Sequence, residues 1–224
     1  MMPRLIVERN QLNYIGIFLK PAFELWGEGQ RMFRGLFSIF SPYGVKLSNL
    51  HNSLSSLDPA DQELSVSVAS VLCRFKFDRI ECTRSDATEE DISDFPNLLV
   101  RCDEWLRSEM SDFSFSSHLF TYFAHTRIEG ATSREVLKNL STMDIKDLGE
   151  TRGAGLIFRY DLVEKDWELQ FTIDHSLLVG DGLFVQFSIL SKADRQDYLD
   201  VLLTGRSLLE KALATMGLEF HDQL

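Results

Sequence analysis

The stretch that decides the fold is residues 63–77, ELSVSVASVLCRFKF. Apolar and polar side chains alternate along nearly all of it. Successive side chains of a β-strand point to opposite faces, so this alternation is typical of a sheet with one face on a core and the other in water. It predicts two strands, 63–71 and 73–77, of an antiparallel sheet.

Other parts of the chain are rich in β-branched and aromatic residues, which favour strands. We predict further strands over 12–26, 46–54, 113–128, 156–163, 167–178 and 183–190. Pro21 should bend the first of these or place it at an edge, because proline has no N–H to donate. Val-Gly-Asp-Gly between the last two predicts a hairpin.

Four segments have helical spacing of apolar residues. The clearest is the last, which runs from a Ser191 cap to a stop at Gly217. A shorter helix starts with the capping box of Thr132 and Glu135. Another starts near Asp94, and the fourth covers about 30–40.

These elements follow one another in the same order twice: long strand, helix, three strands, helix. We therefore predict an α+β fold with a duplicated unit, 1–110 as the first repeat and 111–224 as the second. Chance recurrence of strands and helices is the alternative. Because the linker 108–112 is short, we expect one compact body with about eight antiparallel strands and helices packed on one face.

The 224 residues carry a formal net charge of −11. Such a surface repels DNA and anionic lipid, so we expect neither nucleic acid nor membrane as a partner. No apolar run reaches the ~20 residues of a membrane span. Cys73, Cys82 and Cys102 lie in apolar or periodic segments, which predicts buried free thiols and a cytoplasmic location.

We find no motif for catalysis, for a cofactor or for a metal. Gly27-Glu-Gly29 and Gly153-Ala-Gly155 lack the context of a phosphate loop. His118 and His125 should point to opposite faces of one strand, so they cannot share a metal ion. Asp174, His175 and Ser176 are neighbours in a predicted strand and cannot form a relay among themselves. Paired carboxylates such as those of the acidic run 86–94 fit a solvated surface better than a calcium loop.

The feature that stands out is an aromatic and basic segment from Tyr14 to Tyr43. Residues 1–50 contain six Lys or Arg against three Glu, the opposite balance to the rest of the chain. The apolar stripe of 30–40 is also wider than one packing face requires. We predict an interface or ligand contact at Trp26, Arg31, Phe33, Arg34, Phe37, Phe40 and Tyr43. The alternative is that these side chains only fill the core.

The sequence thus favours a non-catalytic binding or interaction protein that acts through a partner protein or as a homo-oligomer. Two alternatives remain open. One is a small-molecule binder with an apolar pocket between sheet and helices. The other is an enzyme with a dispersed carboxylate site, which leaves no local motif.

Overall fold

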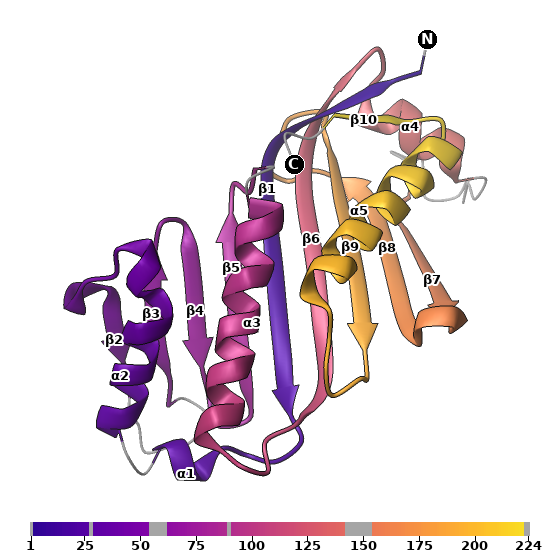
Figure 1. The fold of residues 1–224 in the computed structure, drawn as a ribbon. Coiled ribbons are helices and arrows are strands. Elements are labelled where there is room, and N and C mark those ends of the chain that lie inside the picture. Colours follow the sequence, from indigo (N-terminus) through magenta and orange to yellow (C-terminus); the bar gives the residue numbers. More distant parts are fainter. Residues whose placement is uncertain (1, 27–28, 54–61, 89–90, 142–153, 222–224) are drawn as a thin grey trace.

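A computed structural model describes residues 2–26, 29–53, 62–88, 91–141 and 154–221 (Figure 1). Its strands are β1 (Arg4–Phe18), β2 (Leu50–Asn52), β3 (Leu64–Val68), β4 (Val71–Phe75), β5 (Arg79–Ser85), β6 (Phe115–Glu129), β7 (Leu156–Leu162), β8 (Trp167–His175), β9 (Leu183–Ser191) and β10 (Glu219–His221). Its α-helices are α1 (Phe23–Trp26), α2 (Gly29–Phe40), α3 (Asp91–Glu109), α4 (Ser133–Leu140) and α5 (Tyr198–Thr215). The fold is α+β, as the sequence predicts.

The two long strands β1 and β6 form the middle of a single ten-stranded sheet. The strand order is β2-β3-β4-β5-β1-β6-β9-β8-β7, and β10 pairs with β1 off this path. Every pair is antiparallel except β1 with β10. The antiparallel sheet is therefore confirmed, with β5 and β10 as strands in addition to the eight expected.

A register shift in β1 sets which side chains enter the core. The pairing of β1 with β6 is irregular between Val7 and Arg9. Before the shift Leu5 is buried, and after it Leu12 and Tyr14 are buried. One extra residue in a strand reverses its alternation, so the shift lets both parts of β1 face the same core.

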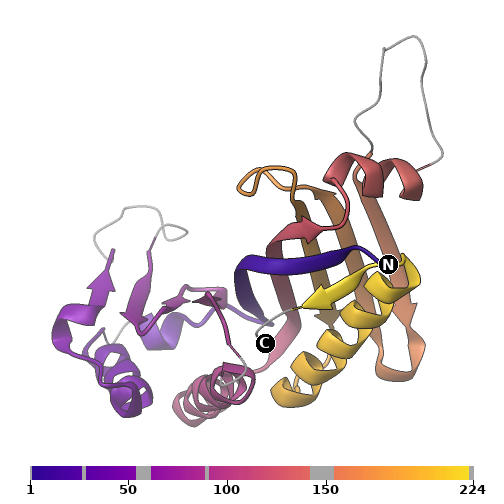
Figure 2. The ribbon, with the colours of Figure 1, turned by 90° about the horizontal axis from the view of Figure 1, so that it is seen from above.

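Helices α2, α3 and α5 lie side by side on one face of the sheet (Figure 2). We call this the helix-covered face. Across β5, β1 and β6 the direct partners Cys82, Tyr14 and Phe120 project to one face. It is the helix-covered face, because Tyr14 Oη lies 3.5 Å from Tyr198 Oη of α5. The short helix α4 lies next to β8. Its predicted capping box is present, because Thr132 Oγ1 accepts from the Glu135 N–H and the Glu135 carboxylate accepts from the Thr132 N–H at 2.8 Å.

The predicted boundaries of β1 and the predicted start of α5 were wrong. The strand predicted over 12–26 starts earlier, at Arg4, and ends at Phe18. After Pro21 the chain turns, the Ala22 N–H donates to the Phe77 carbonyl at 2.7 Å, and 23–26 is helical. Helix α5 is capped by Asp197, whose side chain accepts from the Asp200 N–H, and Ser191 is the last residue of β9.

Strand β5 was missing from the predicted strands. Residues 83–85 belong to β5, and α3 begins at Asp91. Only Ile80 and Cys82 mark β5 as a half-buried strand, so its alternation is easily missed.

The three cysteines are free and buried, as the sequence predicts. Cys73 and Cys82 face each other across β4 and β5. Burial raises the pKa of both thiols, and contact with Cys82 together with burial raises the pKa of Cys102. The thiolate is the reactive form of cysteine, so these buried thiols have low reactivity.

Within the described ranges, no helix is both long and apolar enough to cross a membrane.

Candidate functional site

The predicted contact segment folds into α1, α2 and the turn that follows α2. One side of α2 is core, because Met32, Leu36 and Phe40 are almost completely buried. The opposite side carries Arg31, Arg34 and Phe37, which are all exposed. We call these three residues the α2 surface. They are spaced three apart, so they form one ridge along the helix.

The structure therefore divides the seven predicted residues into groups. Phe40 is core and offers nothing to a partner. Trp26, Phe33 and Tyr43 are half-buried and pack against the core. Trp26 also stacks on Phe77, with ring centroids 4.7 Å apart. Only Arg31, Arg34 and Phe37 are open to solvent, and Phe37 is 39% exposed.

Arg31 also links α2 to the end of α3. Its guanidinium forms an ion pair with the Glu109 carboxylate and donates to the Glu109 carbonyl at 3.3 Å. The Arg31 side chain keeps 44% exposure. An exposed pair of this kind contributes about 0–1 kcal/mol to stability, so Arg31 can exchange partners at small cost.

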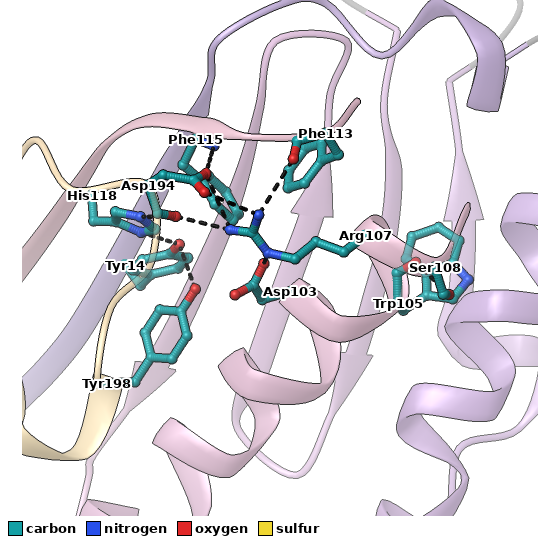
Figure 3. Close-up of polar contacts among 10 residues, drawn as sticks. All are labelled: Tyr14, Asp103, Trp105, Arg107, Ser108, Phe113, Phe115, His118, Asp194 and Tyr198. Carbon is teal, nitrogen blue, oxygen red and sulfur yellow. Dashed lines mark hydrogen bonds and ion pairs between the residues drawn. The ribbon is translucent and has the colours of Figure 1, made fainter. Parts of the chain in front are cut away.

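A polar cluster is buried where the two halves of the chain meet (Figure 3). Tyr14 Oη lies 2.8 Å from His118 Nδ1 and 3.5 Å from Tyr198 Oη. His118 Nε2 lies 3.4 Å from the Asp194 carbonyl oxygen. A carbonyl oxygen can only accept, so Nε2 carries the proton, Nδ1 accepts from Tyr14, and the Tyr14 oxygen is left to accept from Tyr198.

Burial governs the acid–base properties of this cluster. It lowers the pKa of His118 to about 4, although hydrogen bonds to the backbone at Asp194 and Ala193 oppose the shift. It also raises the pKa of Tyr14 and of Tyr198. His118 is therefore a neutral imidazole and both tyrosines are neutral phenols at physiological pH.

Arg107 completes the cluster and joins α3 to the second half. Its guanidinium donates to Asp103 at 2.6 Å, to Asp194 at 3.2 Å and to the Phe113 carbonyl at 3.3 Å. Asp194 Oδ1 also accepts from the Phe115 N–H at 2.8 Å. Burial raises the pKa of Asp194, but Arg107 and the Phe115 N–H outweigh it, and the net shift is downward.

We call this cluster the clamp, because its hydrogen bonds join β1 and α3 to the second half of the chain. Among the described residues, the buried side-chain N or O atoms without a partner belong to Arg84 and Gln196, which lie outside it. No local pattern in the sequence indicates the clamp, because Tyr14 and Tyr198 are 184 positions apart.

The Asp174-His175-Ser176 run is split between separate contacts, as predicted from strand geometry. His175 Nδ1 lies 2.9 Å from Ser133 Oγ on α4. Ser176 Oγ lies 2.9 Å from His125 Nδ1 on β6 and also accepts from two backbone N–H groups of its own loop. His118 and His125 project from opposite faces, which is also as predicted. Within the described ranges, no three His, Cys, Asp or Glu residues are grouped to hold a metal ion.

Two cavities bear on the small-molecule alternative. The apolar one lies between the sheet and α5, away from the predicted aromatics, and measures about 60 Å³. A cavity of that size is far below the ~300 Å³ of a typical ligand pocket. The other measures about 180 Å³ and lies beside Phe40 and Tyr43, with Arg84 and Asp91 in its wall.

Comparisons with known proteins add no assignment: no protein-family model matches the chain, and a search of curated proteins gave no match.

Proposed function

We propose that the chain is a non-catalytic binding protein, and that the α2 surface contacts a partner protein or a second copy of the chain. One observation carries this proposal. Phe37 stays exposed beside two arginines on a helix whose other side is fully occupied by the core. Arg and aromatic side chains are enriched at the energetic centres of protein interfaces.

Charge supports the same surface. The chain as a whole has a net charge of −11, whereas the α2 surface carries two arginines, one of which, Arg31, pairs with Glu109 of α3. A partner segment rich in Asp or Glu fits it best, since complementary charge speeds encounter and selects partners. The charge contribution should weaken with added salt, because the Debye length is about 8 Å at physiological ionic strength. The aromatic contribution should persist.

Charge reversal tests the α2 surface. The double variant Arg31→Glu, Arg34→Glu should remain folded and lose the association that the α2 surface mediates. Its matched control is Arg4→Glu, Arg127→Glu, which makes the same change in net charge at two other exposed, ion-paired arginines. Light scattering and pull-down with a defined partner measure the result. If both double variants associate like the wild type, the α2 surface is not the contact.

A small-molecule binder is the second candidate, favoured by the cavity of about 180 Å³ beside Phe40 and Tyr43. Arg84 lines it and pairs with Asp91 at 2.7 Å, while Arg84 Nε is buried without a partner. A cavity of about 150 Å³ holds a benzene-sized molecule. Benzoate, which combines a ring with a carboxylate for Arg84, should then raise the melting temperature of the wild type and not of Val71→Trp, which fills the cavity.

The remaining parts of the proposal concern internal duplication, cellular location and the class of partner. We propose that 1–110 and 111–224 are copies of one unit. The strand order β3-β4-β5-β1 in one half and β7-β8-β9-β6 in the other supports this, and superposition of the halves tests it. The three free thiols support a cytoplasmic location. The acidic net charge supports a partner other than nucleic acid.

A further inference from the structure

Strand β7 forms one end of the sheet order. It pairs with β8 on one side, and within the described residues no strand pairs with its other side. Two large side chains are exposed on it, Ile157 at 60% and Tyr160 at 58%. An edge strand presents backbone N–H and C=O groups that can pair with another strand, and exposed apolar residues strengthen that tendency.

The sequence of β7, LIFRYDL, is complementary to itself in one register. When two copies run antiparallel with Tyr160 facing Tyr160, Arg159 of each copy lies opposite Asp161 of the other, twice. Phe158 then lies opposite Leu162, also twice. We propose that two copies of the chain pair through β7 in this register and join their sheets. The proposal concerns a surface in the second half of the chain and does not depend on the α2 surface.

The faces of the strand agree with this register. Directly opposed residues of an antiparallel pair project to the same face, about 4.5–5.5 Å apart. Phe158 and Leu162 are half-buried and pack against the core, on the helix-covered face with their partners Phe171 and Trp167. Arg159 and Asp161 lie on the opposite face and are exposed. Apolar pairs thus extend the core across the axis, and ion pairs form on the other side.

Neighbouring registers are unfavourable. Centring the pair on Arg159 or on Asp161 places like charges directly opposite each other, which destabilises a sheet. A shift of one residue places Phe158 opposite Asp161. Only the register centred on Tyr160 matches both charges and apolar residues, so charge complementarity selects a second copy over an arbitrary peptide.

The end of β7 adds apolar surface. Val163, just after the strand, is 85% exposed, and in the proposed register it approaches Ile157 of the second copy. Lys165 binds Asp200 at 2.5 Å, which holds the turn after β7 against the start of α5.

Charge exchange tests the register. A seven-residue strand makes a small interface, so we expect a dimer that dissociates at roughly micromolar concentration. Arg159→Asp places carboxylates opposite each other at both sites, and Asp161→Arg does the same with guanidinium groups. Each single variant should weaken the dimer by about tenfold or more in sedimentation velocity. The double variant Arg159→Asp, Asp161→Arg should restore it, and so should mixing the two single variants.

A disulfide trap provides a second readout. In the proposed register Tyr160→Cys places two thiols within the ~4.4–6.8 Å Cα separation that a disulfide spans. Ile157→Cys is the control, because six residues separate the two copies of position 157 along the pair, about 20 Å. The native cysteines are buried and should not interfere.

Oxidation should convert Tyr160→Cys to a covalent dimer and leave Ile157→Cys largely monomeric. Three results would overturn the proposal: a wild type that stays monomeric up to about 100 µM, single charge variants that associate as tightly as the wild type, or equal cross-linking at positions 157 and 160.

Discussion

Leu209→Ala should lower the free energy of unfolding by about 2–5 kcal/mol and the melting temperature by roughly 5–15 °C. Leu209 is buried on α5 and lines the cavity of about 60 Å³ between α5 and the sheet. Truncation enlarges a space that already exists, and each added Å³ of cavity costs about 24 cal/mol. Urea denaturation of both proteins measures the difference.

Leu203→Ala is the matched control for this prediction. It makes the same chemical change on the same helix, but Leu203 is 50% exposed. Exposed substitutions usually change stability by no more than about 0.5 kcal/mol. Equal losses for the two variants would mean that α5 does not pack through the face that carries Leu209 and Leu213.

The wild type should lose stability as the pH falls from about 6.5 to about 4, because of His118. Its pKa is about 4 in the folded chain, against 6.5 for an ordinary histidine. The unfolded chain therefore binds the proton more tightly, and protonation favours unfolding. The contribution of His118 is fully present above pH 6.5 and is lost toward pH 4. At 1.36 kcal/mol per pKa unit the loss is on the order of 3 kcal/mol.

His118→Gln isolates this contribution, because glutamine can form hydrogen bonds but does not titrate in this range. Carboxylates also titrate near the lower limit of this pH range. Burial raises the pKa of Asp103, which acts in the opposite direction, while the lowered pKa of Asp194 adds to the loss at still lower pH. Both carboxylates remain in the variant. Stability measured from pH 7.5 to 4.5 should therefore fall less steeply in His118→Gln, and parallel curves would contradict the role assigned to His118.

Much of the fold could be predicted because its signals are local. The alternation in 63–77 identifies β3 and β4, and the Thr132–Glu135 capping box identifies the start of α4. The misplaced boundaries also have local causes. Pro21 ends an aromatic segment that otherwise resembles a strand, and β5 carries too few apolar residues to stand out.

The sites could be predicted only in part, because they depend on contacts between distant residues. Composition identified the segment that contains the α2 surface, but only the structure separates the exposed Phe37 from the buried Phe40. The clamp of Tyr14, His118 and Arg107 joins elements from both halves, so no spacing in the sequence indicates it. The self-complementary order of Arg159, Tyr160 and Asp161 has meaning only once β7 is known to be an edge.

Site-specific photo-cross-linking at Phe37 tests the binding account most directly. A photoreactive residue at position 37 lies on the α2 surface, and the same residue in place of Leu178 is a control at a side chain that is 63% exposed in the other half. The account predicts a discrete adduct at position 37 that disappears when Arg31→Glu and Arg34→Glu are added, and no such adduct at position 178. The absence of an adduct at 37, or the same adducts at both positions, would contradict it.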